Sequence, residues 1–262
     1  MPGSIRFDRA ADEYDRTRAI SDDAMARTIE LLSSEFADRG RVLEVGVGTG
    51  LLALPLHEAG IALAGIDLTE AMLAKLVEKA GGRPPFPLVL GDAARMPFAD
   101  GSFGAAYLRW VLHLVPDWRV VVAEIARVLR PGAVFLAHLG SYTGPDEEIR
   151  RRFAEIAGVP DRPVGLTWRG HDELDREMEP HGAGVRVLSA VIEEGEGALG
   201  EFLDGIEENL YSWTWNLPDD VRLGAAAEVR AWARDRFGPL DVPMKWEQPH
   251  EWRAYDLPGR RG

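Results

Sequence analysis

The 262-residue chain contains no cysteine. This absence excludes disulfide bonds, thiolate metal sites and any mechanism that needs a sulfur nucleophile. Long apolar runs are also missing, since no stretch approaches the roughly 18 uncharged apolar residues of a membrane span. The first ten residues have no apolar stretch typical of a signal peptide. We therefore expect no membrane span and a cytoplasmic location.

Basic residues are scarce relative to acidic ones, with 30 Lys and Arg against 43 Asp and Glu and a formal net charge of −13 at pH 7. No block of clustered basic residues interrupts this negative charge, which repels a phosphate backbone. The balance argues against nucleic acid as a partner and favours a small molecule. Hydrophobic residues make up 46% of the chain, which is typical of a folded protein rather than a disordered one.

Short β-rich runs alternate with amphipathic helical patterns in the first half of the chain. The patterns predict helices at 51–58, 70–79 and 118–129, and strands at 41–45, 61–66, 88–90, 103–108 and 133–139. Helices of this length between strands imply right-handed crossovers and a parallel sheet with helices on both faces. We therefore predict a doubly wound α/β fold.

The flanks of this region have different patterns. Ser21 caps a predicted helix that ends before Gly40. After residue 140 the patterns predict helices at about 146–157, 171–180, 199–210 and 221–237, and strands at 184–192 and 246–255. The two late helices interrupt the final strands, and we expect them to form a lid that covers a site.

A glycine-rich turn follows the first predicted strand. Glu44 precedes Gly46, Gly48 and Gly50 in the spacing ExGxGxG. Glycines at such a turn let the backbone approach a ligand closely and leave the next helix N-terminus directed at it. The dinucleotide fingerprint GxGxxG is not matched, because Leu51 stands where its third glycine would be. Taken alone, the run is also compatible with an ordinary tight connection from strand to helix.

Two carboxylates follow the next two strands, at the edge where a parallel sheet binds its ligand. Asp67 comes 17 residues after Gly50, where its carboxylate can accept hydrogen bonds from both hydroxyls of a ribose. Leu68 and Met72 come next and can form an apolar wall beside a purine. Asp92 follows the third strand. Either aspartate could instead only cap a turn or a helix.

The order and spacing of these motifs over about 41–139 resemble the class I S-adenosylmethionine-dependent methyltransferases of the type 11, ubiquinone- and menaquinone-biosynthesis-like kind. The resemblance rests on the ExGxGxG run, on the stretch from Gly91-Asp92-Ala93 to Phe103, and on Leu129-Arg130-Pro131-Gly132. It implies a Rossmann-like, mostly parallel seven-stranded sheet whose last strand is antiparallel. It also implies S-adenosylmethionine as methyl donor, S-adenosylhomocysteine as product, and no metal.

The same resemblance assigns parts of the donor to residues. The glycine loop would wrap the methionine half, Asp92 would meet the exocyclic amine of adenine, and Ala93 would meet the ring through its backbone. Tyr14 and Arg18 belong to an N-terminal segment similar to one that folds over the donor in this family, and could hold the methionine carboxylate. Arg109, after the fourth strand, is a further candidate for donor contact.

The candidates for acceptor contact lie in two places. Trp110 and His113 follow the fourth strand, in a segment similar to the one beside the transferred methyl group in the family. His113 is the candidate general base for a hydroxyl acceptor, with a purely structural role as the equal alternative. An aromatic cluster in the late insertion could form a wall for an apolar or planar acceptor or could only pack the lid: Tyr211, Trp213 and Trp215.

These observations predict methyl transfer to an O, N or C atom of a small-molecule acceptor by in-line displacement, a reaction that needs alignment more than a base. Residues 1–40 would form a helical segment over the donor site, 41–139 the donor-binding core, and 140–262 the rest of the sheet with a helical lid at about 197–240. Two alternatives stay open: a nicotinamide-dependent oxidoreductase on a similar sheet, and a sensor that binds the donor without catalysis.

Overall fold

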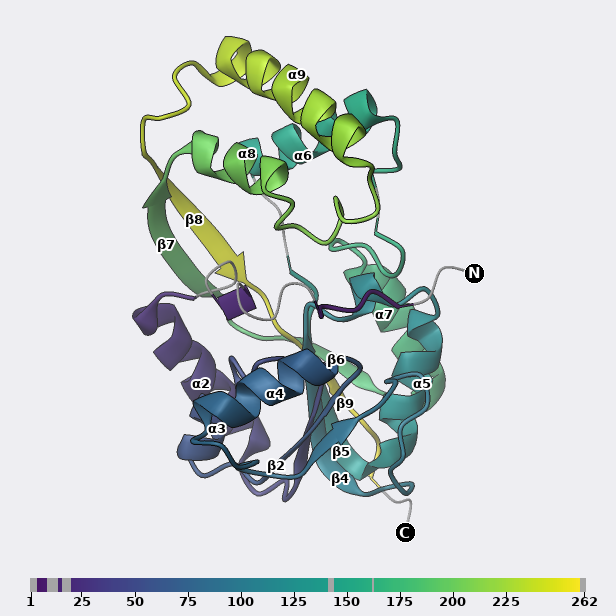
Figure 1. The fold of residues 1–262 in the computed structure, drawn as a ribbon. Coiled ribbons are helices and arrows are strands. Elements are labelled where there is room, and N and C mark those ends of the chain that lie inside the picture. The colour runs from purple at the N-terminus through teal and green to yellow at the C-terminus, as the bar shows by residue number, and fades with distance from the viewer. Residues whose placement is uncertain (1–3, 9–13, 16–19, 141–143, 162, 260–262) are drawn as a thin grey trace. The chain divides into compact units, whose positions relative to one another are not determined.

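The computed structural model describes residues 4–8, 14–15, 20–140, 144–161 and 163–259. The chain divides into two compact units (Figure 1). The first comprises Met1–Gly140, Val164–Val191 and His250–Gly262, and the second comprises Ser141–Pro163 and Ile192–Pro249. In the described part of the chain, no helix combines the length and apolar character needed to cross a membrane.

The first unit is built on a seven-stranded sheet in the order β3-β2-β1-β4-β5-β9-β6. All strands are parallel except β9, which runs antiparallel to its neighbours β5 and β6. This topology confirms the predicted doubly wound sheet with an antiparallel last strand. The strands are β1 (Val42–Val45), β2 (Leu63–Asp67), β3 (Leu88–Leu90), β4 (Phe103–Arg109), β5 (Leu129–His138), β6 (Gly184–Val187) and β9 (Arg253–Asp256).

Helices cover both faces of this sheet (Figure 1). One face packs against α2 (Asp22–Phe36), α3 (Ala53–Glu58) and α4 (Glu70–Lys79). The other packs against α5 (Trp118–Val128) and α7 (His171–Met178). Because side chains alternate along a strand, Tyr107 of β4 enters the first core and Leu108 enters the second. Both faces of the sheet are apolar and are covered by helices.

The second unit is mainly helical. It consists of α6 (Pro145–Ala157), α8 (Leu199–Glu207), α9 (Asp219–Phe237) and a two-stranded sheet of β7 (Val191–Gly197) and β8 (Met244–His250). Its core is formed by apolar side chains from all three helices, among them Phe153, Leu203 and Val229. The unit thus has its own hydrophobic core.

Two strand predictions in the last third of the chain were wrong. The expected strand 184–192 is split into β6 and β7, and the expected strand 246–255 is split into β8 and β9. The pieces belong to different sheets, β6 with β9 and β7 with β8. At the break, Leu188 N–H donates to the Trp252 carbonyl at 2.9 Å, and the Trp252 side chain is buried in the first unit. An alternating pattern continues through such a bend, so the sequence does not reveal it.

Candidate active site

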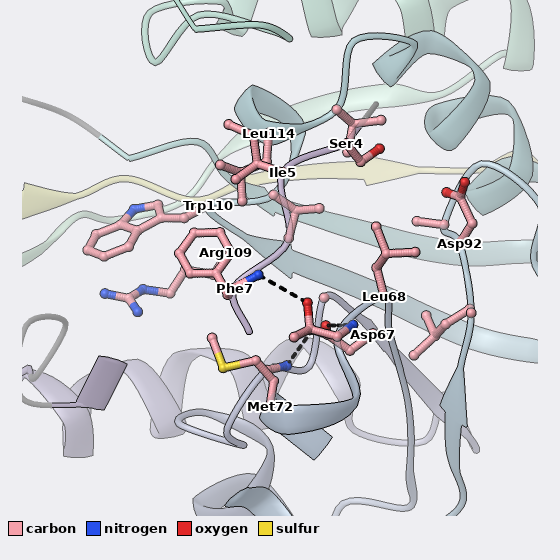
Figure 2. A pocket seen from close by; sticks show the side chains of 18 of the residues that line it. Ser4, Ile5, Phe7, Asp67, Leu68, Met72, Asp92, Arg109, Trp110 and Leu114 are labelled. Atoms are coloured by element: carbon pink, nitrogen blue, oxygen red, sulfur yellow. Dashed lines mark hydrogen bonds between the residues drawn. The ribbon is translucent and has the colours of Figure 1, made fainter. Parts of the chain in front are cut away.

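A cavity of about 680 Å³, part of it open to solvent, lies at the carboxyl ends of the parallel strands of the first unit. The wall is formed by the loop after β1, the end of β2 with the start of α4, the turn after β3, the segment after β4, and part of the N-terminal segment (Figure 2). The predicted sheet edge therefore does carry a cavity.

Two of the three glycines after β1 line this cavity, and all three have positive φ angles: Gly46 (+75°), Gly48 (+52°) and Gly50 (+77°). A Cβ atom at Gly46 would lie 2.5 Å from Val111 Cγ2. At Gly50, which is not among the described lining residues, a Cβ would lie 2.8 Å from Leu76 Cγ. Gly46 and Gly48 therefore shape the cavity wall, whereas Gly50 makes room for α4 beneath it.

Asp67 ties the end of β2 to the glycine loop. Its Oδ2 accepts a hydrogen bond from Gly48 N–H and its Oδ1 accepts one from Thr69 N–H, both at 2.8 Å (Figure 2). Burial raises the pKa of this carboxyl, and the backbone N–H donors oppose that shift. The Leu68 N–H and the Thr69 side chain act on the carboxyl in the same direction. Asp67 also lines the cavity.

The predicted adenine-side residues also meet at the cavity. Leu68, Met72, Asp92 and Ala93 all line it. Asp92 Oδ1 accepts a hydrogen bond from Ala94 N–H at 2.9 Å, which closes an Asx turn. Asp92 and the Arg109–Trp110 pair lie on opposite sides of the cavity in the view of Figure 2.

Trp110 adopts a strained backbone conformation at the cavity wall, with φ of +58°. The left-handed region costs a bulky residue about 1–3 kcal/mol. Two contacts hold Trp110 in this conformation, and the absence of a side chain at Gly140 leaves room for it. Trp110 N–H donates to the His138 carbonyl at 3.0 Å, the Arg109 guanidinium carbon lies 3.8 Å from the indole centroid, and Gly140 leaves space where a Cβ would lie 2.6 Å from Trp110 Nε1. Strain of this kind is concentrated at functional positions.

His138 packs behind Trp110, with the two ring centroids 6.1 Å apart. Its Nδ1 lies 2.8 Å from the Glu251 carbonyl, which requires an N–H at this atom, and its Nε2 lies 3.4 Å from His250 Nδ1. Burial lowers the pKa of His138 well below 6.5, so the ring is neutral at pH 7. Nothing in the sequence distinguishes His138 from an ordinary strand residue, because its neighbours come from the distant C-terminal segment.

The N-terminal segment forms part of the cavity wall through Ser4, Ile5, Phe7 and Tyr14. Ile5 N–H donates to the Leu114 carbonyl at 3.1 Å, and Phe7 N–H donates to Thr69 Oγ1 at 3.3 Å (Figure 2). Tyr14 was predicted at the site, whereas Ser4 and Ile5 have no recognisable signal in the sequence.

The other predicted donor residues have different surroundings. Arg109 lines the cavity, and Arg18 lies outside the described residues. Glu44 is buried beneath the glycine loop and is not among the described lining residues. Tyr107 Oη–H donates to Glu44 Oε2 at 2.7 Å, and burial raises the pKa of Glu44 to about 8. Glu44 therefore lies in the sheet beside Tyr107, and a contact with the donor stays a prediction.

Some of the predicted acceptor residues line the cavity and others do not. Trp110 lines the cavity, as do Val111, Leu114 and Val115, which the sequence did not single out. His113 belongs to a short 3-10 helix (Leu112–Leu114), and its ring centroid lies 5.7 Å from that of Trp168. It is not among the described residues that line the cavity.

The aromatic residues of the late insertion belong to the second unit. Tyr211 and Trp213 stack with centroids 5.6 Å apart, and the Trp213 ring also packs edge-on against Phe153 at 5.3 Å. Trp215 Nε1–H donates to the Asn209 carbonyl at 3.0 Å. These contacts are those of packing within the unit, and a role toward an acceptor stays a prediction.

Comparisons with known proteins identify relatives of the chain. A family model described as "Methyltransferase domain" matches residues 43–137. The chain is 39% identical over 142 residues to phosphatidylethanolamine N-methyltransferase of Cereibacter sphaeroides, a match that covers 52% of this chain and 66% of that protein. It is 32% identical over 195 residues to demethylmenaquinone methyltransferase of Corynebacterium efficiens, covering 67% of this chain and 83% of that protein.

Among solved structures, the YcgJ protein of Bacillus subtilis superposes with a TM-score of 0.60 at 19% identity, covering 91% of this chain and 99% of that one. At this identity the likeness shows the fold alone. The demethylmenaquinone relative, matched over most of its length, shows the family. The chain belongs to the class I S-adenosylmethionine-dependent methyltransferases of the type 11 kind.

Proposed function

We propose that the protein transfers the methyl group of S-adenosylmethionine to an oxygen, nitrogen or carbon atom of a small-molecule acceptor, by in-line displacement at the cavity of the first unit. The observation that carries the proposal is the Asp67 carboxylate, which lies at the end of β2 and is held by the N–H groups of Gly48 and Thr69. Family membership weighs against the nicotinamide-dependent alternative, which rested only on glycines between a strand and a helix.

The donor would occupy the cavity in a defined order. Gly46 and Gly48 would contact its methionine half, where their lack of a Cβ keeps the wall open, and Asp67 would accept hydrogen bonds from the ribose hydroxyls. The base would lie toward Leu68, Met72, Asp92 and Ala93. Tyr14 and Arg109, which also line the cavity, would contact the carboxylate end.

The acceptor would approach beside Trp110. The wall there is apolar, with Ile5, Leu114 and Val115 among the lining residues. Such a wall favours an acceptor with an apolar or planar part next to the reacting atom, and it excludes water from the displacement. The names of the two relatives are consistent with this, because one acts on phosphatidylethanolamine and the other on demethylmenaquinone.

An in-line displacement needs alignment of donor and acceptor more than it needs a base. His113 stays the candidate base for a hydroxyl acceptor and would have to act from beside the cavity. His113→Ala should lower turnover more than affinity for the donor. An equal loss of both would assign His113 a structural role. We further propose that the second unit, which contains the predicted lid at about 197–240, sets acceptor specificity.

The test combines binding and turnover. Asp67→Ala should weaken S-adenosylhomocysteine binding in calorimetry by about tenfold or more, since a hydrogen bond to a charged group contributes about 1.5–3 kcal/mol. The exposed Asp23→Ala serves as control. Turnover is then measured as S-adenosylhomocysteine release with phosphatidylethanolamine, a demethylmenaquinone analogue, and simple phenols and amines.

Release with one acceptor would support the proposal. Tight donor binding without release across a broad set would favour the sensor, and unchanged affinity in Asp67→Ala would contradict the ribose contact.

A further inference from the structure

A cluster of three residues connects the N-terminal segment, the glycine loop and α4. Lys79, the last residue of α4 (Figure 1), donates from Nζ to Asp15 Oδ2 at 2.7 Å and to the Thr49 carbonyl at 3.0 Å. Thr49 Oγ1–H donates to Asp15 Oδ1 at 2.5 Å. Asp15, Thr49 and Lys79 thus form a closed set of hydrogen bonds, called the Asp15–Thr49–Lys79 cluster below. None of the three lines the cavity among the described residues.

The cluster holds the part of the glycine loop that is intrinsically least constrained. Thr49 stands between Gly48 and Gly50, which have φ angles of +52° and +77°. Glycine populates many backbone conformations, so the shape of this turn depends on external contacts. On one side Gly48 is held by Asp67. On the other, the Lys79 ammonium holds the Thr49 carbonyl.

The cluster also holds the N-terminal wall of the cavity. Asp15 directly follows Tyr14, which lines the cavity. Because both carboxylate oxygens of Asp15 accept hydrogen bonds from the cluster, the backbone next to Tyr14 is held toward the glycine loop. One lysine at the end of a helix therefore connects two separate walls of the cavity.

The charges are suited to this role. Lys79 lies at the C-terminal end of α4, where the helix dipole favours a cation. The Lys79 and Asp15 side chains are 31% and 36% exposed, so salt in the solvent screens their attraction. The Thr49 side chain, in contrast, is almost fully buried. The strength of the cluster should therefore respond to ionic strength while its position stays set by Thr49.

We propose that Lys79 and Asp15 are positioning residues for the methyl donor: the cluster holds the glycine loop and Tyr14 in the arrangement that binds the donor, and donor affinity depends on it. The inference rests on the proposed function of the cavity. Neither residue touches the donor in this account, and both act through Thr49 and Tyr14.

The test measures S-adenosylhomocysteine binding by calorimetry on the full chain. We expect Lys79→Met and Asp15→Asn each to weaken binding by roughly three- to tenfold. The double variant should bind with the same affinity as the single variant that binds less tightly, because both substitutions remove the same connection. Lys79→Arg, which keeps the charge, should bind within about twofold of the wild type. Lys245→Met, an exposed lysine of the second unit, is the matched control and should bind as the wild type does.

Salt provides a readout that a general loss of structure would not give. Raising sodium chloride from about 20 to about 500 mM should weaken binding in the wild type more than in Lys79→Met. Equal affinity of Lys79→Met and Lys245→Met, or additive losses in the double variant, would overturn the inference while leaving the function intact. Failure of the wild type itself to bind S-adenosylhomocysteine would overturn both.

Discussion

Replacing Glu44 by glutamine tests how the buried carboxyl beneath the glycine loop contributes to stability. Glu44 is 4% exposed, and its side chain accepts a hydrogen bond from the Tyr107 hydroxyl. Burial raises its pKa from 4.5 to about 8. Glutamine has nearly the same shape, keeps an oxygen that can accept this hydrogen bond, and does not ionise. The substitution therefore removes the titration with little change in packing.

The sign and size of the effect follow from the pKa. A carboxyl whose pKa is raised on folding stabilises the protein fully below pH 4.5, and this stability is lost as the pH rises through about 8. The whole shift corresponds to about 5 kcal/mol, at roughly 1.4 kcal/mol for each pH unit. Between pH 5.5 and 8.5 the wild type should lose about 3 kcal/mol of unfolding free energy relative to Glu44→Gln.

Urea unfolding followed by circular dichroism at pH 5.5, 7 and 8.5 measures this difference. Glu30→Gln, an exposed carboxylate on α2, serves as control and should differ from the wild type by the same small amount at every pH. A difference between Glu44→Gln and the wild type that stays constant across this range would refute the reasoning. It would mean that Glu44 is solvated, or remains ionised through contacts stronger than those from Tyr107 and Arg109.

The remaining predictions concern the two ends of the cavity. Gly46→Ala should weaken S-adenosylhomocysteine binding by about tenfold in calorimetry, because its Cβ would meet Val111. Gly60→Ala is the control, since Gly60 also has a positive φ but a Cβ there would enter open space and add only backbone strain. Equal affinities of the two variants would argue against the clash at Gly46. Folding favours the neutral form of His138, whose pKa is depressed, so we expect the wild type to lose stability as the pH falls below about 6.5. His138→Gln should remove this loss. Parallel unfolding free energies of both proteins from pH 7 to 5 would contradict that.

Local patterns were sufficient to predict the order of helices and strands from residue 41 to residue 139. Apolar periodicity defined α4 (Glu70–Lys79) and β3 (Leu88–Leu90) to the residue, and the expected order of strands and helices from 41 to 139 is the observed one. Asp67, Asp92 and the glycines could be placed at one edge because parallel strands bring their carboxyl ends together. Each of these inferences needs only residues close in the chain and a rule of sheet geometry.

The acceptor side was much less predictable. His113 was a candidate because of its place in a motif, yet Trp110, Leu114 and Val115 line the cavity and His113 packs against Trp168. The left-handed conformation of Trp110 depends on a carbonyl from β5 and on space at Gly140, neither of which a sequence pattern displays. Side-chain direction after a strand is decided by such neighbours.

The sequence by itself determined the fold class, the sheet edge that carries the cavity and the family, because periodicity and glycine spacing are local and their consequences are general. Tertiary structure alone decided which distant residues meet. Asp15 contacts Lys79 across 64 positions, and Phe7 contacts Thr69 across 62. It also decided that the last expected strand splits between two sheets. Contacts of this kind depend on the packing of whole elements, and a one-dimensional pattern carries no record of that packing.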